Sequence, residues 1–342
     1  MVIKCPKCGK SFILNDSLIK SNITQIFCPN CNNRIIVEKK EEETKSNESL
    51  IQIPKEKLDK ILSKIEDLPT LPIVIQRILQ LINDPKATTK QIGSIITSDQ
   101  SLTAKTLKLV NSAFYGFSKK ITTVDQAIVI IGFNAVKNLA ISASVFDIFK
   151  NMNQKSSFDR YGFWTHSTAV AFIAKQISED TRIGNPGEVF VSALMHDIGK
   201  IILDVYFSDE MNRILYNANN KNISFIQSEE EILGFTHPEV GFLLSRKWNL
   251  PDNLYIPIRY HHNPNKAIKY ESIVAIVHTA NIIAKAGNIG YDGDSVTPKI
   301  STNAWNLLKQ MKPDLSAETI KIYIDSAKHN IEASDFLKVA IS

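Results

Sequence analysis

Hydrophobic residues follow different patterns in the two parts of the chain. After residue 55 they recur every three or four residues, which is the spacing of one helix face. The first such stripe comprises Leu58, Ile61, Leu62 and Ile65. Before residue 38 they form short runs rich in β-branched and aromatic side chains, which are typical of strands. The expected strands are Ser11–Leu14, Ile23–Phe27 and Arg34–Val37. The sequence therefore predicts a mostly all-α protein, a helical bundle preceded by a small β unit.

Capping and turn residues mark the ends of the expected helices. Candidate N-caps, whose hydroxyl groups can accept a backbone N–H, are Thr88 or Thr89, Ser101 and Ser316. The segment from Gly287 to Pro298 is expected to be a loop because it contains Gly290, Gly293 and two aspartates. The helices expected after the first are 73–82, 89–96, 102–111, 125–131, 134–149, 302–311 and 317–340.

A charged segment separates the two parts. From Glu38 to Ser49 the chain has no apolar residue, so burial cannot offset the entropy lost on ordering it. Partial helix is the alternative to a flexible tether. We expect residues 1–37 to form the β unit, residues 38–56 a flexible charged linker, residues 57–290 the main helical domain, and residues 291–342 a C-terminal helical extension.

The composition is that of an ordinary globular protein, with 342 residues and 44% hydrophobic residues. There is no apolar run near the ~20 residues that a membrane span needs, and the N-terminus has no apolar signal core. We therefore expect a cytoplasmic protein without a membrane partner. The net charge of +5 comes from 40 basic and 35 acidic residues. Because no dense basic block is present, a nucleic-acid partner is not favoured.

All four cysteines lie before residue 32, as Cys5, Cys8, Cys28 and Cys31. Two C-x2-C pairs let four thiolates converge on one tetrahedral zinc ion, and such a closed site is structural rather than catalytic. The alternatives are a redox pair or four unrelated thiols. A unit this small would draw much of its folding energy from the metal. The region resembles the short zinc ribbons at the N-termini of many bacterial regulatory proteins, which implies an adaptor role.

A series of motifs lies in the helical part in a definite order. They are Leu68-Pro69-Thr70-Leu71-Pro72, Ser98-Asp99-Gln100-Ser101-Leu102-Thr103, 109–116 (LVNSAFYG), 121–128 (ITTVDQAI), Trp248-Asn249-Leu250-Pro251 and His261-His262. Over about residues 60 to 285 the chain thereby resembles HDOD domains. These are all-helical relatives of HD-type metal-dependent phosphohydrolases, found in bacterial signalling proteins. The one departure in these motifs is Gln100, where the family usually has proline.

The resemblance also implies a candidate metal site in the second half of the chain. Residues in the order of the HD-type ligands are His166, His196, Asp197, His237, His261 and His262. Asp197 would bridge one or two divalent metal ions, and imidazole with carboxylate suits iron, manganese, zinc or nickel. Such a metal lowers the pKa of bound water toward ~7 and polarises a phosphoryl oxygen. Lys200 is the candidate to contact a phosphate.

The last ligand departs from the HD-type pattern. Where the catalytic pattern has an aspartate, this chain has Asn281, whose amide oxygen is a neutral and weaker ligand. The expected function is therefore a bacterial regulatory protein with a non-catalytic interaction or ligand-sensing domain. It would have a protein partner, with a nucleotide as the alternative ligand. The alternative function is a metal-dependent phosphohydrolase acting on a nucleotide or cyclic dinucleotide.

Several polar residues are expected to have structural roles. Asp292-Gly293-Asp294 lacks the spacing and closing glutamate of a calcium loop. His278 and His329 are expected to be packed or surface residues. Caps or buried polar anchors are expected at Asp99, Asn111 and Ser112.

Overall fold

The structure is a computed structural model of the chain. It describes residues 2–4, 7–9, 11–13, 23–27, 31, 34–38, 56, 57, 59, 61, 71–82, 88–111, 117, 119–150 and 155–333. The chain divides into two compact units, Met1–Lys55 and Glu56–Ser342. The predicted linker, residues 38–56, lies outside the described residues except at its two ends, where Glu38 closes a strand and Glu56 is helical.

The described residues of the smaller unit form two antiparallel strand pairs. Three of the strands lie where the apolar runs predicted them, and β1 was not predicted. In the first pair Val2 lies opposite Ile13, and in the second Ile23 lies opposite Glu38. The strands are β1 Val2–Lys4, β2 Ser11–Ile13, β3 Ile23–Phe27 and β4 Arg34–Glu38.

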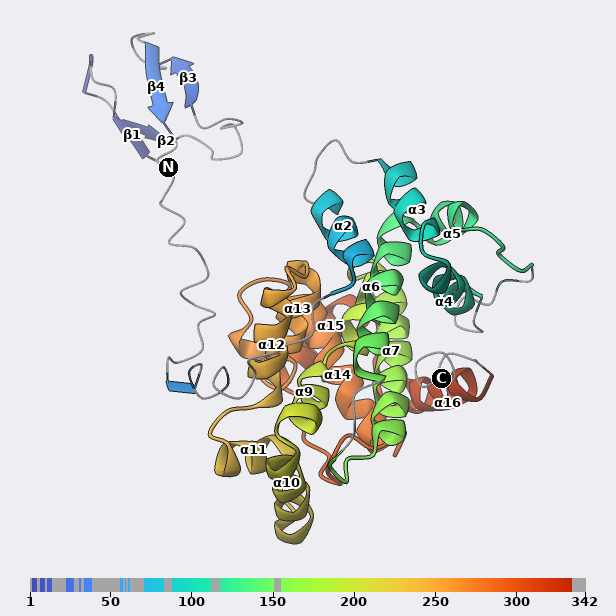
Figure 1. The fold of residues 1–342 in the computed structure, drawn as a ribbon. Coiled ribbons are helices and arrows are strands. Elements are labelled where there is room, and N and C mark those ends of the chain that lie inside the picture. Colours follow the sequence, from blue (N-terminus) through green and yellow to red (C-terminus); the bar gives the residue numbers. More distant parts are fainter. Residues whose placement is uncertain are drawn as a thin grey trace. The chain divides into compact units, whose positions relative to one another are not determined.

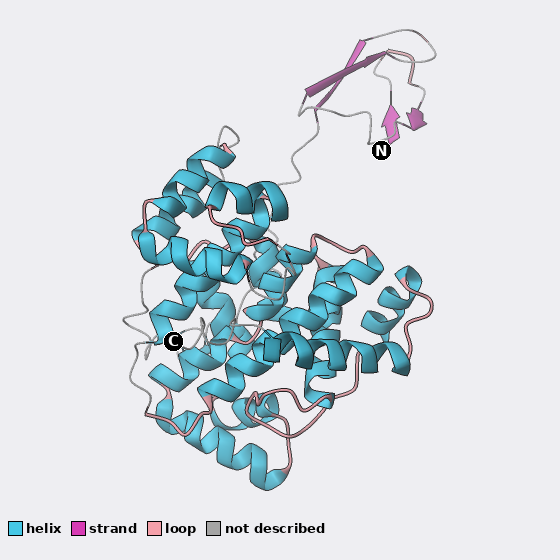
Figure 2. Ribbon diagram, turned by 90° about the vertical axis from the view of Figure 1, so that its right-hand side faces the viewer, coloured by secondary structure: helices cyan, strands magenta, loops and turns pink. Residues whose placement is uncertain are grey.

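The larger unit is helical, and Figure 2 shows strands only in the smaller unit among the described residues. Its helices are α2 Ile73–Ile82, α3 Thr89–Thr97, α4 Gln100–Val110, α5 Val124–Ile131, α6 Phe133–Lys150, α7 Arg160–Thr181, α8 Pro186–Leu194, α9 Ile198–Tyr206, α10 Ser208–Lys221, α11 Phe225–Ile232, α12 His237–Lys247, α13 Asp252–Tyr260, η3 Pro264–Lys266, α14 Glu271–Ala286, α15 Thr302–Met311 and α16 Ala317–Ala333. The predicted helices over 73–82 and 302–311 are confirmed to the residue, and 134–149 is one residue short at each end. The predicted helix over 317–340 is described as far as Ala333.

The helix ends confirm some predicted caps and correct one. Thr88 caps α3 in a capping box with Gln91. Ser101 is not the cap of α4, because the helix begins at Gln100, two residues before the predicted start, and the carboxylate of Asp99 accepts from the N–H of Leu102 at 2.9 Å. Aspartate and serine cap equally well, so the pattern could not choose between them.

Long central helices organise the larger unit (Figure 1). The helices α2 to α5 pack on one another and on α6, and α6 contacts α8. The helix α7 is buried along most of its length, where α8, α14 and α16 pack against it. The candidate C-terminal extension is therefore part of the same helical packing, since α15 lies on α14 and α16 on α7.

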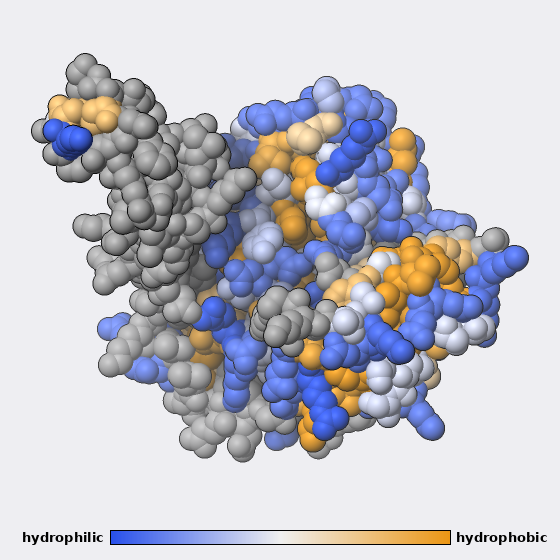
Figure 3. All heavy atoms as spheres, turned by 90° about the horizontal axis from the view of Figure 1, so that it is seen from above, coloured by the Kyte–Doolittle hydropathy of each residue, from blue (hydrophilic) through white to orange (hydrophobic). Residues whose placement is uncertain are grey.

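The surface carries scattered apolar side chains. Figure 3 shows the face that is seen from above, where orange apolar atoms lie in several places among hydrophilic ones. Large exposed apolar side chains of the described residues include Ile73 of α2 and Val129 and Ile130 of α5. Among the described residues, no helix combines the length and apolar character needed to span a bilayer.

Candidate metal centre

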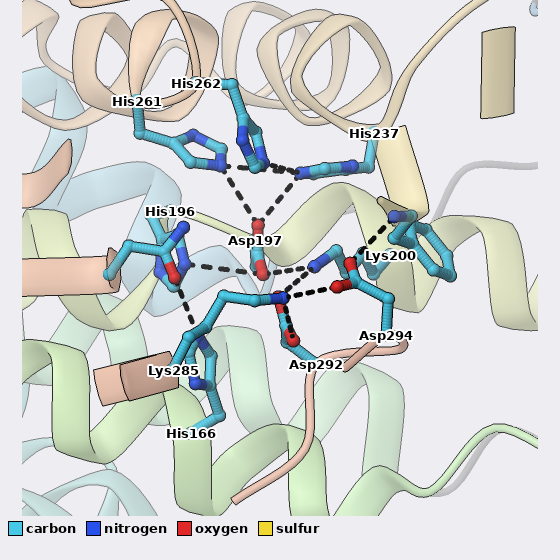
Figure 4. Close-up of polar contacts among 12 residues, drawn as sticks. His166, His196, Asp197, Lys200, His237, His261, His262, Lys285, Asp292 and Asp294 are labelled. Atoms are coloured by element: carbon cyan, nitrogen blue, oxygen red, sulfur yellow. Dashed lines mark hydrogen bonds and ion pairs between the residues drawn. The ribbon is translucent and has the colours of Figure 1, made fainter. Parts of the chain in front are cut away.

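The predicted site residues of the helical unit lie together, although they come from five separate parts of the chain (Figure 4). Each lies in a helix or directly at a helix end, so the scaffold that holds them is rigid. They are His166 in α7, His196 and Asp197 between α8 and α9, His237 at the start of α12, His261 and His262 after α13, and Asn281 in α14.

A close approach of two helix starts places Asp197 beside His237. A Cβ atom on Gly199 would lie 2.0 Å from the carbonyl oxygen of His237, so only glycine fits there. Asp197 itself occupies the N-cap position of α9, but its side chain makes no capping hydrogen bond. Its carboxylate instead points into the cluster, where both Asp197 and His196 are completely buried.

One oxygen of Asp197 faces three imidazole rings. Oδ1 lies 2.9 Å from His237 Nε2 and 3.1 Å from His261 Nε2. His237 Nε2 lies 3.4 Å from His261 Nε2 and 3.2 Å from His262 Nε2. These four ligand atoms lie within 4.8 Å of one another.

The rings are turned so that their free nitrogen points inward. His261 Nδ1 donates to the carbonyl of Ile258 at 3.0 Å, and His196 Nδ1 donates to the carbonyl of Ala193 at 2.7 Å. Because a carbonyl only accepts, the proton of each neutral ring is on Nδ1 and the lone pair is on Nε2. A lone pair of His261 thus faces the Asp197 carboxylate with no proton between them. Accordingly Asp197 Oδ1 and His196 Nε2 are buried without a hydrogen-bond partner.

This arrangement fits a metal ion. Two atoms that each lie about 2.1 Å from one ion are about 3.0 Å apart at a right angle and about 3.4 Å apart at a tetrahedral angle. The separations of 2.9 to 3.4 Å around Asp197 Oδ1 fall at these values. Imidazole nitrogens with one carboxylate oxygen also form a common donor set for divalent transition metals.

The other oxygen of Asp197 faces a cation of the protein itself. Lys200 Nζ donates to Asp197 Oδ2 at 2.7 Å, and His196 Nε2 lies 3.4 Å from the same oxygen. Beyond His196, His166 Nε2 donates to Asn281 Oδ1 at 2.9 Å. His166, His196 and Asp197 form a second group of atoms within 4.8 Å of one another.

The electrostatic environment keeps most of the rings neutral. Burial lowers the pKa of His166 to about 4 and that of His261 to about 3. Burial and the neighbouring His261 and His237 hold the pKa of His262 well below its usual range. For Asp197, burial acts to raise the pKa, but His196, Lys200 and His237 together hold it well below its usual range. Neutral imidazoles around an ionised carboxylate are the protonation states that metal binding needs.

His237 is the exception among the rings, because a buried carboxylate lies behind it. Glu229 Oε2 is 2.8 Å from His237 Nδ1, and Glu229 Oε1 accepts from the backbone N–H of His237 at 2.9 Å. Burial alone would lower the pKa of His237, but Glu229 and Asp197 raise it. A carboxylate behind a metal-binding histidine fixes the ring and strengthens it as a ligand.

Four charged residues around the site were not predicted from the sequence as functional. Glu229 lies in a polar helix whose pattern indicates only exposure. Lys285 and Asp294 bond to each other at 3.0 Å, and Lys285 bonds to Asp292 at 2.7 Å. Asp292 and Asp294 belong to the Asp292-Gly293-Asp294 motif, which lacks the spacing of a calcium loop. Their position just after the helix that carries Asn281 is the sequence signal that could have identified them.

The remaining predictions concern the polar residues that were expected to have structural roles and the four cysteines. His278 is buried with both ring nitrogens bonded, to His261 O and to the N–H of Ser301, and His329 is exposed, as expected. Asn111 holds both backbone groups of Ile121, as a polar anchor should. Ser112, Cys5 and Cys28 lie outside the described residues, while Cys8 and Cys31 are partly exposed.

Comparisons with known proteins cover most of the helical unit. The HDOD domain profile matches residues 68–264, which is more than half of the chain. The crystal structure of an HDOD domain protein of unknown function from Geobacter sulfurreducens is 28% identical, with a TM-score of 0.68 over 83% of this chain and 98% of that chain.

Two further relatives extend the comparison. A structure from Marinobacter aquaeolei, provisionally named a signal transduction protein, is 19% identical with a TM-score of 0.66 over 85% of this chain and 68% of that chain, and shows the shared fold alone. An uncharacterized protein of Treponema pallidum is 25% identical over 226 residues, or 65% of this chain. The match spans 43% of that relative's length.

Proposed function

Because the chain belongs to the HDOD family, we propose that it is a bacterial signalling protein whose helical unit binds a divalent metal ion and acts as a non-catalytic interaction or ligand-sensing module. The observation that carries the metal is the contact between the lone pair of His261 Nε2 and Asp197 Oδ1, 3.1 Å apart and without a proton between them. A cation between the two atoms converts this repulsion into ligation.

Burial and ligand identity support the non-catalytic part of the proposal. His196, Asp197 and His261 have no exposed surface, and Lys200 is 1% exposed. A phosphodiester would have to displace packed side chains to reach them. Asn281 adds a second obstacle, because a neutral amide holds a divalent metal less tightly than the carboxylate of the HD-type pattern does.

The smaller unit is the proposed adaptor. Cys5, Cys8, Cys28 and Cys31 would hold one structural zinc ion at the ends of the two strand pairs, with residues 38–56 as a tether to the helical domain. The spacing of the two C-x2-C pairs supports this proposal. The name of the Marinobacter structure is compatible with a protein partner in a signalling pathway.

A second function has one observation in its favour. Lys200 lies 2.7 Å from Asp197, where an ammonium could meet a phosphate held at the same site. A bound metal would then supply water activation, as in HD-type phosphohydrolases acting on a nucleotide or cyclic dinucleotide. The buried ion pairs of Lys200 with Asp197 and Asp292 count against this reading, because substrate would have to break them.

The test is turnover by the full chain, loaded in turn with Mn²⁺, Fe²⁺, Zn²⁺ or Ni²⁺, on a panel of phosphodiesters and nucleotides. We expect bound metal without turnover in the natural sequence. Asn281→Asp restores the acidic ligand and serves as the comparison. Turnover by the natural sequence that disappears in His196→Ala would establish the hydrolase and overturn the non-catalytic function.

A further inference from the structure

Five buried charges alternate in one continuous series that begins at the second oxygen of Asp197. Lys200 Nζ contacts Asp197 Oδ2 at 2.7 Å and Asp292 Oδ2 at 3.2 Å. Lys285 Nζ contacts Asp292 Oδ1 at 2.7 Å and Asp294 Oδ1 at 3.0 Å. Figure 4 shows the series leading from the cluster to the loop after α14. Each member has at most a small exposed surface, so solvent screens these pairs little.

The series holds Lys200 in one position. Its ammonium lies between two carboxylates and 5.0 Å from the centre of the Phe225 ring. The loop that supplies Asp292 is itself fixed, because Asp294 Oδ2 accepts from the N–H of Phe225 at 2.7 Å. A Cβ atom on Gly290 would lie 2.2 Å from the backbone nitrogen of His166, so the start of the loop packs directly on α7. Lys200 is thus a built-in part of the core rather than a mobile arm.

The two oxygens of the Asp197 carboxylate have different neighbours to balance their negative charge. Around Oδ1 stand His237, His261 and His262, and no lysine or arginine contacts that oxygen among the described residues. Oδ2, in contrast, already contacts the ammonium of Lys200. A divalent ion on that side would be placed next to a fixed positive charge.

The ligands for a second ion are also weaker. His166 donates from Nε2 to Asn281 Oδ1, so the nitrogen that would bind metal carries a proton in this arrangement. Asn281 brings no negative charge. The Oδ2 side therefore offers His196 and a carboxylate oxygen that Lys200 already occupies.

We propose that Lys200, held in place by Asp292, is the internal cation of the Oδ2 side, so that the cluster binds a single divalent ion at Asp197 Oδ1, His237, His261 and His262. This inference rests on the metal binding of the proposed function and refines it. Lys200 takes the place of a second metal ion, and Asp292 is a positioning residue that keeps the ammonium there.

The test is Mn²⁺ binding to the full chain, followed by electron paramagnetic resonance. Soft thiolates disfavour Mn²⁺, so this probe reports the cluster rather than the four cysteines. Two ions bridged by one carboxylate, roughly 3.5–4 Å apart, couple magnetically, whereas a single ion gives an isolated six-line spectrum. We expect one bound Mn²⁺ per chain and the isolated spectrum.

Variants then identify the cause. Lys200→Met removes the internal cation while keeping an apolar stem against Phe225, and should take up a second, more weakly bound Mn²⁺ with a coupled spectrum as the Mn²⁺ concentration is raised. Lys285→Met is the matched control, since it breaks the same series without touching Asp197, and should bind one. If Lys200→Met does not fold, Lys200→Arg keeps the charge and should still bind one, and the natural sequence decides the stoichiometry on its own.

The outcomes separate this inference from the function on which it rests. Two coupled ions in the natural sequence would overturn the internal-cation role but leave the metal-binding function intact. A folded Lys200→Met variant that still binds one ion would also overturn it. If the natural sequence binds neither Mn²⁺ nor any other metal of the turnover test, metal binding and the inference are both overturned.

Discussion

The two oxygens of the Asp197 carboxylate differ in how the fold treats their charge. Oδ1 faces ring nitrogens at 2.9 and 3.1 Å, and it has no hydrogen bond to relieve it. Oδ2 receives a hydrogen bond from the ammonium of Lys200 at 2.7 Å. Ring nitrogens surround one oxygen, whereas the other oxygen is already paired with a cation of the protein. If the cluster binds metal as proposed, the number of ligand residues in the sequence does not give the number of ions, because a lysine can neutralise the same carboxylate.

The largest expected effect is on stability, from removing the cation of the Oδ2 side. In the metal-free protein, Lys200→Met leaves Asp197 and Asp292 without their shared partner, and breaking a buried ion pair costs about 3–5 kcal/mol. The free energy of unfolding from urea titration measures it. Lys221→Met breaks an exposed pair with Glu231 and should change stability by no more than about 0.5 kcal/mol. Equal effects of the two variants would refute the buried role of Lys200.

The next effect concerns metal affinity on the Oδ1 side. Glu229→Gln keeps the shape of the side chain but removes the charge behind His237, which should weaken metal binding about 10–100-fold. Calorimetric titration with Zn²⁺ or Mn²⁺ would measure the change. Glu231→Gln, on the same helix but exposed, should bind as the natural sequence does. Unchanged affinity in Glu229→Gln would show that the carboxylate does not support the ligand.

A smaller and pH-dependent effect is expected at Asp292. Burial acts to raise its pKa, but Lys200, His166 and Lys285 hold the pKa well below its usual range. The carboxylate therefore stabilises the fold above the unfolded pKa of about 3.9, and this contribution is lost as the pH falls toward the folded value. Asp292→Asn should cost about 1–2 kcal/mol at pH 7, because each lysine keeps one other carboxylate.

Urea titrations at pH 7, 5, 4 and 3 would measure this difference, which should narrow only below about pH 4. Asp314→Asn, at an exposed aspartate paired with Lys312, is the matched control and should show a small difference throughout. A stability difference for Asp292→Asn that stays constant down to pH 3 would contradict the ionised role of Asp292.

The smallest effect is expected far from the cluster. Asp99→Ala removes the N-cap of α4 and should cost about 1 kcal/mol. Metal content should not change, since α4 packs mainly against α3, α5 and α6, none of which carries a cluster residue. Thermal unfolding together with elemental analysis checks both parts, and a change in metal content would mean that the two ends of the helical unit are coupled.

The fold could be predicted largely from apolar spacing, with errors at the ends of elements. The helix over 302–311 was predicted to the residue, because its stripe and flanking loops are distinct. For α4 both Ser101 and Asp99 were candidate caps, and Asp99 is the one in the structure, because two good capping residues lie two positions apart and only the backbone decides between them.

The candidate site could be predicted only as far as its motif order. The histidines and Asp197 follow a known order, and Asn281 was identified as the departure from it. Lys200 was the candidate to contact a phosphate, and the structure adds that its ammonium is paired with two carboxylates. That pairing could not be predicted, because Lys200 and Asp292 are 92 positions apart and the loop after α14 has no motif that indicates a partner.

The most direct test of the metal centre is the metal content of the full chain and of His261→Ala, measured by elemental analysis of protein prepared in parallel. His261 contacts Asp197 Oδ1 at 3.1 Å and has no exposed surface, whereas the exposed His329→Ala is the control. We expect His261→Ala to lose one equivalent of metal and His329→Ala to retain it. Equal metal content in all three proteins would contradict a metal ion at Asp197.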